Sequence, residues 1–258
     1  MQNEEELNII ELLDKFDEIA SKGWVESRRS HNTGIGKTFE DLLEKDEDNL
    51  ADPDYKGIEV KTHRSASESY TSLFTASPTG PEKSENTRLR EAYGNLDPES
   101  NLKTLHSSIF ATRKTNYFNT YKFQVEVDRT EEKVFLLVFN MDDELIERRT
   151  YWTFEELNKR LERKLKLLSF VDGKNKIENG KEYFKYEKMT ICKFKDFDKF
   201  LKALENGTIM LDIRIGVYAS GKNKGKTHDH GTGFRIKESN LEEIYDVIAV
   251  RENEKEDN

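Results

Sequence analysis

Cysteine is almost missing from this chain, because Cys192 is the single one among 258 residues. One thiol cannot form an internal disulfide, so a disulfide-stapled secreted scaffold is excluded. The sequence also has no apolar run of membrane length, and its first residues are acidic where a signal peptide would be basic and then apolar. We therefore expect a cytoplasmic protein that does not enter membranes.

A basic excess is also lacking. The chain has 42 Lys and Arg against 51 Asp and Glu, a net charge of -9. This sum argues at first against nucleic acid, but binding depends on where each sign lies. Acidic residues concentrate in the first hundred residues and at 252–257, and basic residues at 113–114, 159–166 and 214–237. The composition thus permits a nucleic-acid partner without establishing one.

The apolar content is low, at 34%, but 15 Phe and 10 Tyr add bulky core volume. A chain of this length forms one large domain or two smaller, closely packed ones. Helical periodicity or end signals predict helices at residues 5–20, 34–43, 87–93, 153–168, 196–205 and 239–248. Strand-like patterns predict strands at residues 57–63, 70–75, 105–112, 122–127, 133–139, 181–195, 208–219 and 232–237. We expect the strand at 70–75 to be the antiparallel neighbour of the strand at 57–63.

The first chemical pattern is Asp54-x4-Glu59-x-Lys61. Residues two apart in a strand point to the same face, so Glu59 and Lys61 project together while Ile58 and Val60 face a core. The incoming turn can bring the Asp54 carboxylate back beside Glu59. Two close carboxylates repel unless a cation lies between them, and hard oxygen ligands suit Mg²⁺. A lysine beside that metal can orient an attacking water, so the set predicts phosphodiester cleavage.

This pattern also has an ordinary explanation. In a chain that is 36% charged, Glu-x-Lys on a strand is most often a solvated outer face with a weak ion pair. A nucleotide-binding loop at Gly36-Lys37-Thr38 is not favoured, because His31 stands where that motif needs a glycine. We expect the glycines to form a tight turn that places the helix carrying Glu40 against the strand of Glu59.

The second pattern lies near the C-terminus. Potential hydrogen-bond donors and acceptors are dense there, and their members are Asp212, Arg214, Lys222, Lys224, Lys226, His228, His230 and Arg235. Arginine can bind the major-groove edge of guanine and histidine can contact base edges, while lysines on a glycine-rich loop suit phosphates. A merely solvated basic loop and a zinc site formed with Cys192 are the alternatives. We expect Cys192 to be a small core residue.

Together these segments resemble the MvaI/BcnI-type restriction endonucleases, relatives of the mismatch-repair nickase MutH within the PD-(D/E)xK nucleases. The matching positions are Gly34 to Glu40, Asp54-x4-Glu59-x-Lys61, Asp212-x-Arg214 and His228-x-His230-x4-Arg235. The resemblance implies a mixed α/β, restriction-endonuclease-like core, with helices flanking a mixed β-sheet and two lobes around a DNA-binding cleft. It also implies a type II enzyme that cuts double-stranded DNA at a short site, with CC and GG flanking a central base or base pair.

The resemblance further implies roles for single residues. Asp54 and Glu59 would be metal ligands, Lys61 would act on the water, and Glu40 would be an accessory acid. Asp212, Arg214, His228, His230 and Arg235 would read bases. The metal would be Mg²⁺, with Mn²⁺ as a substitute, and the enzyme would act as a monomer that nicks the strands in turn. Its partners would be double-stranded DNA and, functionally, a cognate DNA methyltransferase in the same host.

Other functions stay open from the sequence. A MutH-like repair nickase recruited by partner proteins, and a non-catalytic DNA-binding module, fit the same motifs. For the domains, we expect a catalytic lobe at 1–120, a DNA-recognition lobe at 121–250, and a disordered acidic tail at 251–258. The two lobes can interleave along the chain.

Overall fold

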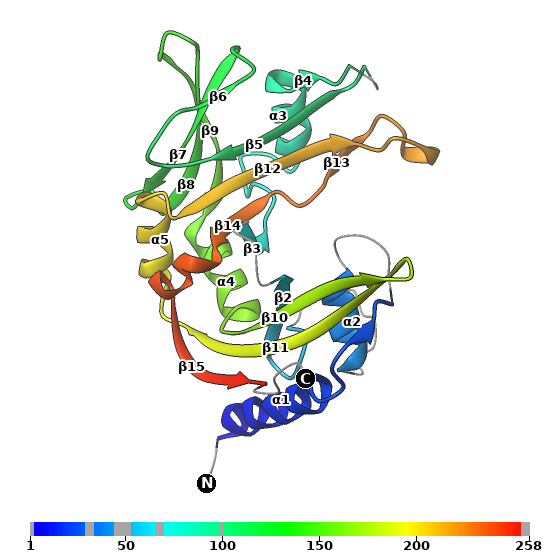
Figure 1. Ribbon diagram of the computed structural model, residues 1–258. Coiled ribbons are helices and arrows are strands. Elements are labelled where there is room, and N and C mark those ends of the chain that lie inside the picture. The colour runs from blue at the N-terminus through cyan, green and yellow to red at the C-terminus, as the bar shows by residue number, and fades with distance from the viewer. Residues whose placement is uncertain (1–2, 29–33, 44–52, 65–69, 99–100, 254–258) are drawn as a thin grey trace. The chain divides into compact units, whose positions relative to one another are not determined.

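The computed structural model describes residues 3–28, 34–43, 53–64, 70–98 and 101–253 (Figure 1). The chain forms two compact units that interleave along the sequence. Unit 1 contains residues 1–68, 161–195 and 245–258, and unit 2 contains 69–160 and 196–244. In the described residues, no helix is both long and apolar enough to span a membrane.

Unit 1 is built on a five-stranded mixed sheet. Its elements are α1 (Glu4–Ala20), β1 (Val25–Glu26), α2 (Gly34–Leu42), β2 (Ile58–Arg64), β10 (Leu167–Glu178), β11 (Lys181–Phe194) and β15 (Tyr245–Glu252). The strand order is β1-β11-β10-β2, with β15 also paired to β11. β10 pairs with β2 in parallel and with β11 in antiparallel fashion. The mixed sheet with flanking helices confirms the expected fold class.

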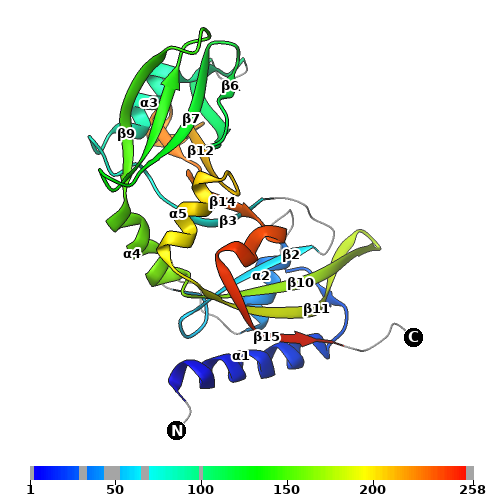
Figure 2. The same cartoon turned by 90° about the vertical axis from the view of Figure 1, so that its left-hand side faces the viewer.

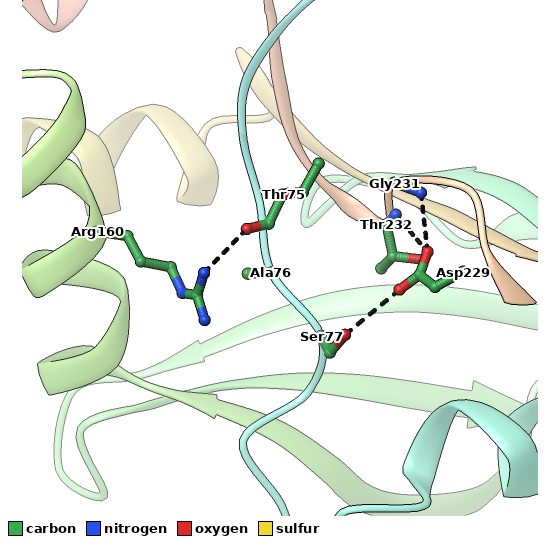
Figure 3. Close-up of a pocket in the computed structure, with 7 residues that line it drawn as sticks. All are labelled: Thr75, Ala76, Ser77, Arg160, Asp229, Gly231 and Thr232. Atoms are coloured by element: carbon green, nitrogen blue, oxygen red, sulfur yellow. Dashed lines mark hydrogen bonds between the residues drawn. The ribbon is translucent and has the colours of Figure 1, made fainter. Parts of the chain in front are cut away.

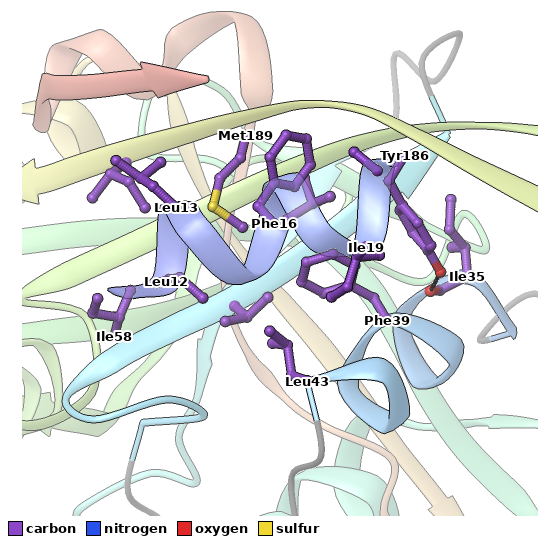
Figure 4. Close-up of a cluster of buried hydrophobic side chains, with 14 of the residues drawn as sticks. Leu12, Leu13, Phe16, Ile19, Ile35, Phe39, Leu43, Ile58, Tyr186 and Met189 are labelled. Carbon is purple, nitrogen blue, oxygen red and sulfur yellow. Dashed lines mark hydrogen bonds between the residues drawn. The ribbon is translucent and has the colours of Figure 1, made fainter. Parts of the chain in front are cut away.

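Helices α1 and α2 cover one face of this sheet (Figures 1, 2 and 4). The shared core is formed by apolar side chains from both helices and from the strands, including Leu12, Phe16, Phe39, Ile58 and Met189. Ile58 and Val60 are buried in it. Because side chains alternate along a strand, Glu59 and Lys61 project from the opposite face of β2, as the sequence predicted.

Unit 2 contains two sheets. The six-stranded sheet has the order β3-β14-β12-β5-β4, with β13 also paired to β12; these are β3 (Tyr70–Thr75), β4 (Asn95–Leu96), β5 (Lys103–Ile109), β12 (Ile209–Val217), β13 (Thr227–Asp229) and β14 (Gly233–Lys237). The four-stranded sheet is β6 (Thr115–Tyr117), β7 (Tyr121–Asp128), β8 (Lys133–Phe139) and β9 (Leu145–Thr153). The helices that lie wholly within unit 2 are α3 (Glu85–Tyr93), α5 (Phe197–Glu205), η1 (Gly221–Asn223) and η2 (Glu238–Glu243). The strands predicted at 122–127 and 133–139 are confirmed as β7 and β8, which pair in antiparallel fashion.

Helix α4 (Phe154–Lys164) crosses the boundary between the units, which falls after Arg160. Thr153 caps its N-terminus, because the Glu156 N–H donates to Thr153 Oγ1 at 3.4 Å. The predicted end at Leu168 is wrong, since Leu167 and Leu168 begin β10. That apolar run lies between β2 and β11, and burial in a central strand overrides the helical preference of leucine.

Two further predictions are corrected. β3 is a strand, but its partner is β14, while β2 pairs with β10. The predicted helix at 239–248 is η2 followed by β15, because the backbone groups along the edge of β11 take β15 as a hydrogen-bonding partner. The expected tail at 251–258 therefore starts too early: Arg251 and Glu252 belong to β15, and residues 254–258 lie outside the described residues.

The expected lobe boundary at residue 120 also differs from the division into units. The two segments of unit 2 alternate with the three segments of unit 1, because β10 and β11, and later β15, return to the sheet that contains β2. All proposed catalytic residues belong to unit 1 and all proposed base-reading residues to unit 2. The functional roles of the two units stay a prediction.

Candidate active site

A tight turn delivers the chain into β2. Tyr55 and Ile58 exchange backbone hydrogen bonds of 2.9 and 2.8 Å, and Lys56 and Gly57 between them have φ of 44° and 87°. These positive φ values are typical of a two-residue hairpin turn. The turn brings Asp54 back beside the strand, where its Oδ2 accepts a 3.0 Å hydrogen bond from the Val60 N–H. The expected return of Asp54 is therefore present in the fold.

Glu59 is the buried centre of this group. The residue is 4% exposed, and its Oε1 lies 3.2 Å from Lys61 Nζ and 3.4 Å from Lys164 Nζ. Its Oε2 is buried and has no hydrogen-bond partner among the described residues. We call Asp54, Glu59, Lys61 and Lys164 the carboxylate cluster. A buried carboxylate oxygen without a donor is costly unless a cation or a donor joins it.

The electrostatics of the cluster agree with this geometry. Burial raises the pKa of Glu59, and the nearby Asp54 carboxylate raises it further, while Lys61 and Lys164 act in the opposite direction. Two carboxylates that favour each other's protonation would both be ionised more readily with a divalent cation between them. The ligands on offer are the carboxylates of Asp54 and Glu59, and Glu59 Oε2 has no donor in the described part of the chain. Such oxygen ligands suit a hard cation such as Mg²⁺.

Glu40 lies on α2, which packs on the other face of β2 from Glu59. Close packing of α2 depends on Gly36, where an added Cβ would lie 2.9 Å from Thr62 Oγ1. Gly36 lies within α2 and not in a turn before it, so the expected close approach of the helix to the strand is confirmed, whereas the glycines belong to the helix itself. The Glu40 carboxylate pairs at 3.4 Å with Lys37 on its own helix. Its role as an accessory acid stays a prediction.

Two neighbours of this face were not predicted from the sequence. Lys164 stands at the end of α4, within the basic stretch 159–166, and lies 3.4 Å from Glu59 Oε1. His63, two residues beyond Lys61, contacts the Asp172 carboxylate through Nε2. Parallel pairing sets β10 against β2 with Asp172 opposite His63. Both contacts arise from pairing with distant segments, which no local spacing reveals.

In unit 2, Asp212 is fully buried. Ser108 Oγ donates to its Oδ1 at 2.8 Å, and Arg214 Nε donates to its Oδ2 at 2.6 Å. Arg235 Nε lies 2.6 Å from the same Oδ2. One carboxylate therefore holds two guanidinium groups, which are 42% and 23% exposed.

The two predicted histidines lie beside Arg214. The His230 N–H donates to the Arg214 carbonyl at 2.8 Å, and the rings of His228 and His230 are 4.3 Å apart. Tyr218 stacks on His228 at 4.2 Å. Across the sheet, His106 on β5 is the register partner of Arg214. We call Tyr218, His228, His230 and His106 the aromatic row; the sequence analysis identified only its two central members.

Asp229 orders the turn after β13. Its Oδ1 accepts from the Gly231 and Thr232 N–H groups at 3.0 and 2.7 Å, and its Oδ2 accepts from Ser77 and Asn86. A cavity of about 280 Å³ lies here, bordered also by Arg160 (Figure 3). The Arg160 guanidinium donates to the Thr75 carbonyl at 3.3 Å. Thus Asp229, which the sequence analysis passed over, fixes the loop between His228 and Arg235.

The lysines and the zinc alternative are the remaining sequence predictions. Lys222, Lys224 and Lys226 are exposed on the segment between β12 and β13. Cys192 is buried in β11 of unit 1, whereas His228 and His230 belong to unit 2. Its burial confirms the expected core role of Cys192.

Comparison with known proteins places the chain. The sequence profile of the MvaI/BcnI restriction endonuclease family matches residues 13–245. The solved structure of restriction endonuclease MvaI in complex with its cognate DNA substrate is 43% identical, with a TM-score of 0.86 over 96% of this chain and 99% of that one. MvaI in the absence of DNA gives a TM-score of 0.64 at the same identity, over 97% and 98%. No curated protein matches the chain.

The profile covers far more than half of the sequence, and the two MvaI structures are matched over nearly their whole length. The fold, the order of the motifs along the chain and the similarity to the MvaI structures agree. The chain therefore belongs to the MvaI/BcnI restriction endonuclease family and is a sequence-specific DNA nuclease.

Proposed function

We propose that this nuclease is a type II restriction enzyme that cuts double-stranded DNA in the presence of Mg²⁺, with Mn²⁺ as a substitute. Its site is short, with CC and GG flanking a central base or base pair, and the enzyme acts as a monomer that nicks one strand after the other. The likeness to a complex of MvaI with cognate DNA supports the substrate. A host methyltransferase would protect the same site, in the cytoplasm where the DNA lies.

The observation that carries the proposal is the open side of Glu59. Its buried Oε2 lacks a donor, and Asp54 is held beside the strand by the Val60 N–H. These two carboxylates would hold the cation, with Glu40 on α2 as an accessory acid. Bound there, Mg²⁺ would act as a Lewis acid toward the phosphate and lower the pKa of a bound water.

The protein side chains would then position the reaction. Lys61 points to the same face as Glu59, and its ammonium donates to Glu59 Oε1 at 3.2 Å. From this place we assign it the orientation of the water that attacks phosphorus in line with the departing oxygen. Lys164, 3.4 Å from the same oxygen, adds positive charge where the phosphate gains negative charge.

For recognition, we assign base contacts to Arg214, Arg235, His228 and His230. Arginine donates two parallel hydrogen bonds to guanine, which suits the proposed GG steps. Asp212 was expected to read a base as well, and its complete burial favours a role through the two arginines it holds. The exposed lysines of residues 222–226 would contact phosphates.

The experiment is cleavage of unmethylated DNA with Mg²⁺, comparing the wild type with Asp54→Ala and sequencing the ends. We expect discrete ends at one short motif from the wild type, and at least a hundredfold slower cutting by the variant, a loss typical for an essential catalytic group. An exposed-site control, Lys199→Ala, should cut as the wild type does.

Two results would contradict the proposal. Equal cutting by Asp54→Ala would remove the carboxylate cluster from catalysis. Sequence-specific binding by a wild type that never cuts would favour a DNA-binding module or a nickase that needs a partner protein. Adding candidate partner proteins to the same reaction separates these two cases.

A further inference from the structure

His106 has no assigned task, yet it lies within the surface that we assign to DNA reading. It is on β5, directly across from Arg214 on β12. Directly opposed residues of antiparallel strands place their side chains on the same face of the sheet. His106 and Arg214 therefore leave the sheet side by side, on the face where Asp212 holds the guanidinium groups.

The aromatic row extends from the loop to this strand. The ring of His106 is 6.3 Å from that of His230, nearly perpendicular to it, and His230 in turn is 4.3 Å from His228. His106 is thus the end of the row on β5. The row continues on β5, a strand that carries none of the positions inferred from the sequence motifs.

Gly216 shows that this arrangement needs space. A Cβ added at Gly216 would lie 2.7 Å from His230 Nε2 and 3.8 Å from His106 Nε2. The two imidazole edges therefore converge over one glycine on β12. Gly216 does not have a positive φ, so its backbone does not require glycine; the missing side chain leaves room for the His230 ring, whereas His106 is at ordinary contact distance from the added Cβ.

The chemical state of His106 suits contact with a ligand. Its side chain is exposed, and in the described part of the chain its ring nitrogens have no hydrogen-bond partner. Partial desolvation lowers its pKa, and the positive charges of Arg214 and His230 lower it further. A neutral imidazole has one donor and one acceptor nitrogen, so it can meet either kind of group on a base edge.

We propose that His106 contacts a base edge in the major groove and sets the preference at one position of the recognition site, beside the base read by Arg214. This inference rests on the proposed function, because it takes double-stranded DNA as the ligand. The geometry that carries the inference is the register of His106 with Arg214 and the contact of its ring with His230.

The test measures binding without cutting. Wild type, His106→Ala, His106→Gln and Lys199→Ala are each bound, in EDTA, to a library of DNA duplexes with randomised positions, and the bound fraction is sequenced. We expect His106→Ala to lose about tenfold in preference at one position and to keep the others, as for one lost base contact. His106→Gln, which keeps a donor and an acceptor, should retain part of that preference.

The contrary results are equally definite. An unchanged preference profile overturns the proposal, and so does a uniform loss of affinity on all sequences, which would identify a phosphate contact. A wild type without any preferred sequence overturns it as well. Cutting is measured separately, so a bound but uncut site contradicts the proposed nuclease reaction while His106 is still tested. Thermal unfolding of each variant shows whether a loss reflects folding.

Discussion

Glu59 in unit 1 and Asp212 in unit 2 are two buried carboxylates. Both have cationic neighbours, but they differ in whether each carboxylate oxygen has a partner. Each lies on a strand with two cationic side chains within 3.4 Å. Both oxygens of Asp212 have partners, from Ser108, Arg214 and Arg235. Glu59 uses Oε1 for both of its lysines and leaves Oε2 without a donor. Asp212 thus has no oxygen left for a further partner, whereas Glu59 has one oxygen that a cation could join.

The difference follows from the cations. Guanidinium is a planar fork of donors that orients on a carboxylate, so the hydrogen bond from Arg214 to Asp212 has a fixed direction, and Arg235 adds a second ion pair to the same oxygen. Ammonium groups are compact point charges, and Lys61 and Lys164 can share one oxygen of Glu59 without enclosing the other. Burial alone thus does not separate the two carboxylates, and the proposal that Glu59 is a metal ligand rests on its unsatisfied oxygen.

The largest expected effect that tests this comparison is that of Asp212→Asn. The amide keeps the shape and removes the charge that holds two guanidinium groups. Breaking a buried ion pair costs about 3–5 kcal/mol, and we expect about 2 kcal/mol because both arginines reach solvent. Thermal unfolding should show Tm lower by about 4–8 °C, since about 1 kcal/mol corresponds to 2–4 °C at this size.

Asp212→Asn should also reduce discrimination at the positions read by both arginines. The double variants with Arg214→Ala and with Arg235→Ala give the control, because an Asp212 that acts through the arginines adds little to their loss. Additive losses would mean that Asp212 contacts the DNA by itself.

Much of unit 1 could be predicted from local spacing. The side-chain period of two along a strand placed Glu59 and Lys61 on one face and Ile58 and Val60 in the core. The turn at Lys56 and Gly57 brought Asp54 back as expected. The hairpin of β10 and β11 had a signal that went unused, since Asn179 and Gly180 both have positive φ and Asn-Gly is typical of such turns.

The rest depended on pairings that local sequence does not encode. Lys164 reaches Glu59 because the chain returns after α4 to pair β10 with β2. His106 meets Arg214 because β5 and β12 are neighbours in the second sheet. The C-terminal segment became a strand because β11 offered an edge, although its local pattern was interpreted as a helix. The register of distant strands decides these contacts, and a single sequence shows only the period within each strand.

An intermediate effect is expected for Lys164→Ala. If its ammonium stabilises charge at the phosphate, cutting under saturating Mg²⁺ should slow about tenfold, with little change in DNA affinity. Lys164→Arg keeps the charge and should recover most of the rate. Single-turnover cleavage measures this step. Unchanged cutting by the alanine variant would show that Lys164 is a solvated residue at the end of α4 without a role in cleavage.

The smallest effect, and the one of opposite sign, is expected for Glu59→Gln in the metal-free protein. Burial raises the pKa of Glu59 above its ordinary 4.5, so the folded state favours the neutral acid. This stabilisation is complete below pH 4.5 and is lost as the pH rises through the raised pKa, which means that ionised Glu59 destabilises the wild type at neutral pH. Glutamine stays neutral, so Tm in EDTA should rise by about 2–4 °C at pH 7, as for about 1 kcal/mol, and the gain should shrink as the pH falls toward 4.5.

Mg²⁺ should reverse the order of the two Tm values. It binds and stabilises the wild type, whereas the variant has lost one of the proposed ligands. A lower Tm for Glu59→Gln in EDTA, like that expected for Asp212→Asn, would show that Glu59 is as fully satisfied as Asp212 and that its open oxygen is not a metal site.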